Sequence, residues 1–135
     1  MASLQKILFV EDDPDIQMVA QLALEAVGGY TVQMCSSGAE ALAVAEQFAP
    51  DLILLDVMMP GMDGPTTLAE LRKKPTLAHT PVVFMTARVQ RHEIEQYLAI
   101  GAADVISKPF DPMSLSAQVA AIWKKAYEAR SSGTV

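Results

Sequence analysis

Residues 52–56, Leu-Ile-Leu-Leu-Asp, form an apolar run that ends in an acid. A run without polar alternation is typical of a strand that is covered on both faces, as the strands of parallel sheets are. Asp56 closes this run, and an ionised side chain at such a place is costly unless it has a partner. A helix cap or a salt bridge would be the ordinary explanation. We favour a functional carboxylate, because two other apolar runs also end in charged residues.

Those two runs are residues 7–10, which lead into the acids at 11–13, and residues 105–107, which lead into Lys108. Strand-like and helix-like segments alternate along the chain, and this pattern predicts an α/β fold with a parallel sheet. The carboxyl ends of parallel strands meet at one edge of the sheet, where open α/β folds place their sites. We therefore expect the acids and the lysine to gather at that edge.

Capping residues divide the chain into five strand–helix pairs. Asp13 and Asp111 each precede a proline, and proline is favoured at the first helical position. Ser37 with Glu40 predicts a capping box. The expected strands are 6–10, 30–35, 52–56, 81–86 and 104–107, and the expected helices are 14–27, 37–49, 65–74, 90–100 and 111–130. We predict one domain over residues 1–130 and a short flexible tail over 131–135.

The composition narrows the class of protein. The chain has 135 residues, is 51% hydrophobic and carries a net charge of -6, which suits one globular domain. It has no basic run, so we expect no direct binding to nucleic acid. No apolar stretch approaches the roughly 20 residues that span a bilayer, and no secretory signal precedes the first expected strand. Cys35 is the only cysteine, which suits a cytoplasmic protein without a disulfide framework.

Glu11 and Asp12 are candidate metal ligands. Two adjacent acids at a buried strand end repel each other and lose hydration, and a bound Mg²⁺ would relieve both costs. Mg²⁺ takes oxygen ligands and is commonly held by one or two carboxylates together with substrate phosphate. Asp13 is better explained as a helix cap, because the proline after it places it at the start of a helix.

Asp56, Thr86 and Lys108 are candidates for chemistry on a phosphoryl group. A carboxylate can act as a nucleophile and accept a phosphoryl group as an acyl phosphate. Lys108 lies between an apolar strand and Pro109-Phe110, which favours a fixed ammonium that acts as a point charge on phosphate. Thr86 ends another expected strand and offers a hydroxyl at the same edge. Taken singly, the threonine and the lysine have ordinary explanations.

Taken together, these residues resemble the receiver domains of bacterial two-component response regulators. The resemblance covers residues 6–130 and rests on the order and spacing of five motifs, namely Val10 to Asp13, Asp56, Met59 to Gly64, Thr86-Ala87 and Lys108 to Phe110. It implies a flavodoxin-like, doubly wound sheet of five parallel strands in the order 2-1-3-4-5 with five flanking helices. It also implies that Asp56 is the phosphoacceptor.

The resemblance gives the other candidates their roles. Glu11 and Asp12 would be the acidic pair, binding Mg²⁺ with Asp56 and the backbone carbonyl of Met58. Thr86 would be the switch hydroxyl, and Lys108 would be the phosphate-binding lysine with a cis peptide bond after it. Met58 and Arg88 would lie beside the path of the hydrolytic water. An apolar Met58 there predicts a long-lived phosphorylated form.

The chain departs from the family at Val105, where a Tyr or Phe usually moves inward when the threonine engages phosphate. A valine cannot act in that way, so we expect the strand 81–86 and the loop after it to carry the switch. Tyr97 on the helix 90–100 is a secondary candidate. The signal would leave through the face formed by the helix 90–100, the strand 104–107 and the helix 111–130.

The function implied is a phosphorylation-controlled binding module. A sensor histidine kinase or a histidine phosphotransfer protein would donate the phosphoryl group, and a downstream protein would bind the altered face of a monomer or a phosphorylation-dependent dimer. Enzyme activity would be limited to Mg²⁺-dependent self-phosphorylation from small phosphodonors and to autodephosphorylation. Since no output domain follows the last helix, we expect a stand-alone regulator of the chemotaxis-regulator kind. A receiver cut from a longer chain is the alternative.

Two other classes fit less well. Phosphatases of the haloacid-dehalogenase type also use an aspartate at a strand end with Mg²⁺, but they need a second acid two residues later, where this chain has Met58. No general acid is then available for turnover. A dinucleotide-binding domain would need glycines after the first strand. Acids follow residues 7–10 instead, and they would repel a pyrophosphate.

Overall fold

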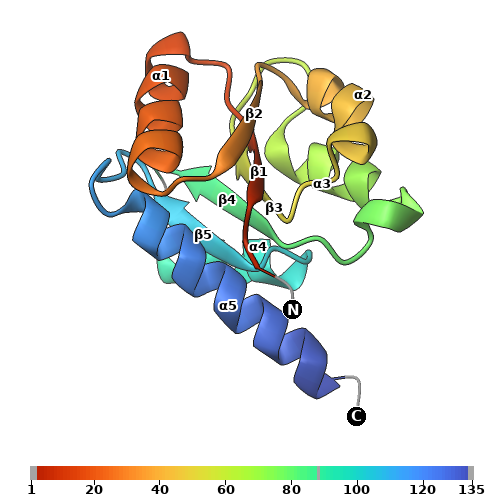
Figure 1. Ribbon diagram of the computed structural model, residues 1–135. Helices are drawn as coiled ribbons and strands as arrows, with labels where there is room; N and C mark the ends of the chain where they lie inside the picture. Colours follow the sequence, from red (N-terminus) through yellow and green to blue (C-terminus); the bar gives the residue numbers. More distant parts are fainter. Residues whose placement is uncertain (1–2, 88, 134–135) are drawn as a thin grey trace.

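Five parallel strands form the central sheet (Figure 1). The computed structural model describes residues 3–87 and 89–133. The strands are β1 (Lys6–Val10), β2 (Thr31–Cys35), β3 (Leu52–Asp56), β4 (Val82–Thr86) and β5 (Asp104–Ser107). Their order in the sheet is β2-β1-β3-β4-β5, and every pairing is parallel. The predicted fold class and strand order are confirmed.

The strand ends lie at one edge, as expected. In the register of the sheet, Val10 pairs with Leu55 and Asp56 pairs with Met85. Thr86 in turn pairs with Ser107, the last residue of β5. Across β1, β3, β4 and β5, the closing residues of neighbouring strands therefore lie within one residue of each other in register along the carboxyl edge. The candidate site residues are these closing residues or the ones that follow them.

Helices cover both faces of the sheet (Figure 1). One face packs against α1 (Pro14–Leu22), the π-helical continuation η1 (Ala23–Val27) and α5 (Leu115–Gly133). The other face packs against α2 (Gly38–Phe48), α3 (Gly64–Arg72) and the short 3-10 helix η2 (Pro75–Leu77). Helix α4 (Arg91–Ala99) lies beside β5 and has no fully buried residue. No helix in the described part of the chain is long and apolar enough to cross a membrane.

The burial of each strand explains its sequence pattern. All residues of β3 and β4 are buried, as are the last four of β1. These strands lie inside the sheet and are covered on both faces, which is why their sequences are continuously apolar. The edge strand β2 is only partly buried, in line with its alternation of apolar and polar residues.

Two of the predicted helix starts are confirmed by their caps. The Oδ1 of Asp13 accepts hydrogen bonds from the backbone N–H of Asp15 (2.8 Å) and of Ile16 (3.4 Å). The hydroxyl of Ser37 accepts a hydrogen bond from the backbone N–H of Glu40 (3.1 Å). The Glu40 carboxylate accepts from the N–H of Ser36, and not from that of Ser37 as in a standard capping box. The helix after β2 therefore begins as the capping box predicted.

The limits of the last helix differ from the prediction. Asp111 accepts hydrogen bonds from Met113 and Leu115, so it caps a turn, and α5 itself begins at Leu115. The helix continues to Gly133, beyond its expected end at residue 130. Of the expected tail, residues 131–133 belong to the helix and residues 134–135 lie outside the described residues.

Candidate functional site

Three acids meet at the carboxyl edge of the sheet. Carboxylate oxygens of Glu11, Asp12 and Asp56 all lie within 4.8 Å of one another. Glu11 and Asp12 follow β1, and Asp56 ends the neighbouring strand β3. Glu11 is 1% exposed and Asp56 is 3% exposed, whereas Asp12 is exposed to solvent. The structure thus brings together three side chains that the sequence placed at the ends of two different strands.

Lys108 joins this group from the end of β5. Its Nζ lies 2.8 Å from Oε1 of Glu11 and 3.3 Å from Oδ1 of Asp56. Its backbone N–H donates to the carbonyl oxygen of Thr86 (2.9 Å), which holds the lysine at the edge. The peptide bond between Lys108 and Pro109 is cis, as the resemblance implied. The ammonium is therefore fixed and faces the acids, and its action on phosphate stays a prediction.

The charges of Glu11 and Lys108 depend on one another. Burial raises the pKa of Glu11 from 4.5 to about 7, although its hydrogen bonds with Lys108 and with the N–H of Asp13 act in the opposite direction. Burial by itself would lower the pKa of Lys108, but the hydrogen bond with Glu11 and the nearby charge of Asp56 outweigh it, so this pKa is raised. The lysine is therefore a permanent cation between two buried carboxylates.

Thr86 ends β4 and is 3% exposed. It comes directly after Met85, the register partner of Asp56, so it lies on the strand next to the phosphoacceptor candidate. Its position at the carboxyl edge agrees with the prediction. Arg88, the other residue predicted to flank the hydrolytic path, lies outside the described residues.

Met58 lies two residues beyond Asp56 and is 68% exposed. Its backbone N–H donates to Oδ1 of Asp56 at 3.4 Å. The side chain offers no acid and no other strong hydrogen-bonding group next to the carboxylate. Position 58 therefore lacks the acid that phosphatases of the haloacid-dehalogenase type carry two residues after their nucleophile. The role of the Met58 carbonyl as a metal ligand stays a prediction.

Gly64 belongs to the motif Met59 to Gly64, but the sequence argument gave it no role of its own. A Cβ atom at Gly64 would lie 2.7 Å from the carbonyl oxygen of Asp56 and 2.8 Å from Cα of Val57. The N–H of Gly64 also donates to the carbonyl of Val57 (2.8 Å). The start of α3 therefore packs directly on the backbone that carries Asp56. The glycine after Asp63 at a helix start was the available signal.

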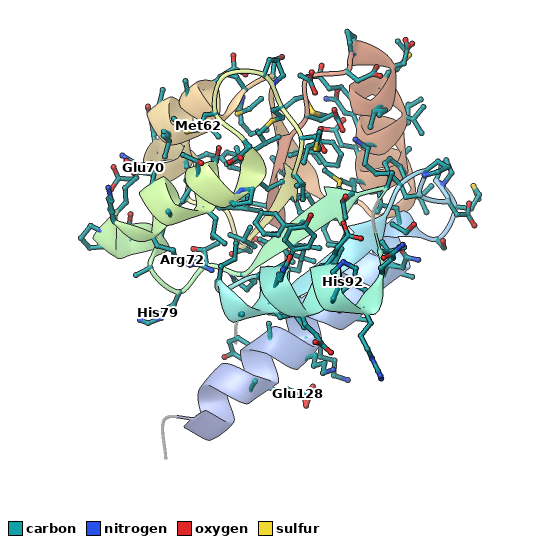
Figure 2. All side chains as sticks on the ribbon, turned by 180° about the vertical axis from the view of Figure 1, so that it is seen from behind. Met62, Glu70, Arg72, His79, His92 and Glu128 are labelled. Atoms are coloured by element: carbon teal, nitrogen blue, oxygen red, sulfur yellow. The ribbon has the colours of Figure 1, made fainter. Side chains whose placement is uncertain are left out.

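The donor set fits a hard divalent cation. All three side chains offer carboxylate oxygens, and no Cys or His belongs to the group, which favours Mg²⁺ over softer metals. Two buried carboxylates with one adjacent ammonium still leave negative charge for a cation to neutralise. The two histidines lie at separate places on the molecule, His79 in the connection before β4 and His92 on α4 (Figure 2). Neither belongs to the acidic group.

Val105 and Tyr97 pack close to the site but in a different way from the family pattern. Val105 pairs with Phe84 in the sheet and is partly buried. The ring of Tyr97, from α4, meets the ring of Phe84 edge to face with centroids 5.2 Å apart. An aromatic side chain thus reaches this part of the core from α4 rather than from β5.

Comparisons with known proteins agree with this geometry. Residues 7–120 match the family described as response regulator receiver domain. Among curated proteins, the response regulator PleD of Caulobacter vibrioides is 43% identical over 116 residues, which are 84% of this chain and 25% of PleD. The DNA-binding dual master transcriptional regulator RpaA of Synechocystis is 38% identical over 120 residues, 89% of this chain and 49% of RpaA. The chain thus spans a quarter to a half of the length of these relatives.

Solved structures are similar to this chain over most of its length. The chemotaxis protein CheY4 of Vibrio cholerae is 29% identical, with a TM-score of 0.82, over 89% of this chain and 99% of that chain. The receiver domain of a histidine kinase from Syntrophus aciditrophicus is 32% identical, with a TM-score of 0.77, over 90% of this chain and 91% of that chain.

Proposed function

Because this chain belongs to the family of response regulator receiver domains, we propose that its phosphorylation-controlled signalling works through Asp56. The domain is a signalling domain rather than a conventional enzyme. One observation carries the assignment of the acceptor. Asp56 is a buried carboxylate that belongs to the acidic group and lies 3.3 Å from a lysine ammonium.

The proposed reaction is a phosphoryl transfer to a carboxylate. An oxygen of Asp56 attacks phosphorus, an acyl phosphate bond forms, and the bond from phosphorus to the donor breaks, with the electron pair leaving on the donor. For a phosphohistidine donor, the leaving group is the imidazole ring. When bound by Glu11, Asp12 and Asp56, Mg²⁺ would neutralise charge on the phosphoryl oxygens.

Two residues of the chain act on the transferred group. Lys108 already contacts Asp56 through its Nζ. After phosphorylation, the same ammonium can donate a hydrogen bond to a phosphoryl oxygen in place of a carboxylate oxygen. The hydroxyl of Thr86 is at the end of the adjacent strand and donates to another oxygen. The same arrangement supports slow self-phosphorylation from small phosphodonors and autodephosphorylation.

We propose that the signal leaves through α4, β5 and α5. Movement of Thr86 toward the phosphoryl oxygens would pull the β4–α4 loop with it. Helix α4, which follows this loop, has no buried residue in the structure, so it can shift more easily than the other helices. A switch needs two arrangements that the phosphoryl group distinguishes energetically. The contact between Tyr97 and Phe84 links α4 to the strand that ends in Thr86, and it supplies that link without an aromatic residue at position 105.

The partners follow from this chemistry. The donor is a sensor histidine kinase or a histidine phosphotransfer protein in the cytoplasm, and the target is a protein that recognises the α4–β5–α5 face of a monomer or a phosphorylation-dependent dimer. This domain does not itself contact nucleic acid. RpaA is described as DNA-binding, but the match covers 49% of its length. The protein acts as a separate regulator or as the receiver of a longer one.

Two measurements test this proposal. Phosphotransfer from a panel of autophosphorylated histidine kinases should label the wild type and not Asp56→Asn. Amide NMR shifts with and without a beryllofluoride mimic of the phosphoryl group should change in α4 and β5 as well as around Asp56. Shifts confined to the loops beside Asp56 would place the output face elsewhere.

A further inference from the structure

Gln17 makes contacts at the site that the proposed chemistry does not use. It lies on α1, and its partly buried side chain reaches back toward the end of β1. Its Nε2 donates a short hydrogen bond to the backbone carbonyl of Glu11 and a second one to the hydroxyl of Ser36 (3.1 Å). A single side-chain amide therefore joins the turn after β1 to the turn after β2.

The other polar groups of Glu11 are also held. Its N–H donates to the carbonyl of Cys35 (2.9 Å), and its two carboxylate oxygens accept from Lys108 (2.8 Å) and from the N–H of Asp13 (3.1 Å). These three bonds involve the end of β2, the residue after β5 and the turn itself. The bond to Gln17 is the one that a helix side chain supplies, and it is made to the carbonyl.

That carbonyl determines where the next residue points. The C=O of Glu11 and the N–H of Asp12 belong to one planar peptide unit, so fixing the carbonyl direction also fixes the start of Asp12. Asp12 is the exposed member of the acidic group, and burial does not restrain its side chain. The orientation of this residue therefore depends on the peptide before it.

The amide of Gln17 is itself oriented by a second acceptor. Its bond to Ser36 limits rotation of the amide, and the N–H of Ser36 donates to the carboxylate of Glu40 (2.7 Å). The backbone N–H of Gln17 donates to the carbonyl of Asp13 (3.0 Å), which anchors the residue in the first turns of α1. The side chain is thus fixed at both ends.

We infer that Gln17 is a positioning residue for the acidic pair, holding the peptide between Glu11 and Asp12 so that both carboxylates face a cation together. This inference rests on the proposed function, because it concerns the same Mg²⁺ site. Gln17 does not touch the cation or the phosphoryl group. It acts through the backbone of Glu11, so its removal should weaken cation binding more than it weakens the fold.

The test replaces the amide with an apolar side chain of similar length. Gln17→Met keeps the length and the helix propensity but removes the donor. Gln21→Met makes the same chemical change one turn later on α1, at an exposed position, and serves as the matched control. Ser36→Ala removes only the second acceptor of the amide. Mg²⁺ affinity is measured by calorimetry and by the amide shifts of residues 11–13, and the melting temperature is measured in EDTA.

Gln17→Met should weaken Mg²⁺ binding about fivefold, the size expected for one hydrogen bond, with a smaller loss for Ser36→Ala and none for Gln21→Met. The melting temperature in EDTA should fall by only a few degrees in Gln17→Met relative to Gln21→Met, and both variants should be fully folded at the temperature of the Mg²⁺ titration. Equal Mg²⁺ affinity in the wild type and Gln17→Met would overturn the inference alone. A wild type that binds no Mg²⁺ would overturn the proposed metal site as well.

Discussion

Lys108 Nζ lies 2.8 Å from Glu11 Oε1, although the two residues are 97 positions apart in the chain. This contact joins the ends of β1 and β5, which are separated in the sheet by β3 and β4. The lysine side chain is 19% exposed and the glutamate side chain 1%. The buried carboxylate of Glu11 is thus held by the ammonium of Lys108, which the proposed reaction also needs. The chemistry of the site and the stability of the fold therefore depend on the same ion pair.

Removal of the Lys108 charge should therefore destabilise the domain as well as slow phosphorylation. At a pH above the pKa of about 7 of Glu11, Lys108→Met leaves two buried carboxylates without their cation, and breaking a buried pair in this way costs about 3 kcal/mol. Urea unfolding in EDTA measures the loss. Lys124→Met, on the exposed surface of α5, is the control and should change stability little. Added Mg²⁺ should restore part of the loss, and a variant as stable as the wild type in EDTA would contradict this account.

Gly64→Ala should disturb the strand end that carries Asp56. The new methyl group would meet the carbonyl of Asp56 at 2.7 Å, so the backbone must move, at a cost of about 2 kcal/mol. Because the displaced backbone carries Asp56, the rate of phosphorylation from a small phosphodonor should also fall below that of the wild type.

Gly61→Ala is the comparison for this substitution. Gly61 has a φ of +80° and open space around its missing Cβ, so alanine there adds about 1 kcal/mol of backbone strain without contact to Asp56. Its phosphorylation rate should stay close to that of the wild type. Equal rates for the two alanine variants would show that the close approach of Gly64 has no effect on the site.

Cys35 should be unreactive in the folded protein. Burial raises the pKa of its thiol to about 12, and the nearby Glu40 carboxylate adds to the shift. The reactive species is the thiolate, so the rate of labelling by iodoacetamide should stay low between pH 7 and 9 and should rise sharply in denaturant. Mass spectrometry of labelled protein measures both. Rapid native labelling at pH 8 would mean that the end of β2 opens more readily than its burial indicates.

Met58→Asn should shorten the life of the phosphorylated form. The methionine is exposed beside Asp56 and cannot hold a water molecule for attack on phosphorus, whereas an amide can. The decay of phosphorylated protein, followed by intact mass, should accelerate severalfold. Met113→Leu, which changes a similarly exposed methionine on the β5–α5 connection, should leave the decay unchanged. An unchanged decay in Met58→Asn would count against this position as a control on hydrolysis.

Much of this arrangement was predictable from the sequence because the main signals are local. The unbroken apolar runs at 7–10 and 52–55 indicated buried parallel strands, and their charged ends indicated one edge of the sheet. Caps at Asp13 and Ser37 gave two helix starts. At Asp111 the same cap-and-proline signal predicted the helix start wrongly, since the residues after it form a turn before α5.

The remaining features depend on contacts between distant segments. The close approach of Gly64 to Asp56 needs the actual packing of α3 on the end of β3. The bridge from Gln17 to Glu11 and Ser36 needs the turns after β1 and β2 side by side. The sequence places Gly64 at a helix start after Asp63, but it does not show which backbone the glycine approaches, and Gln17 lies in no distinctive pattern at all. The structure was needed to give either residue its role.

The most direct test of the central claim is the intact mass of the protein after incubation with a small phosphodonor and Mg²⁺. The wild type should gain one phosphoryl group, and Asp15→Asn, which changes an exposed acid on α1, should gain it at the same rate. Asp56→Asn should gain none, and circular dichroism should show that it is folded under the same conditions. Phosphorylation of Asp56→Asn at the rate of the wild type would contradict the assignment of Asp56 as the acceptor.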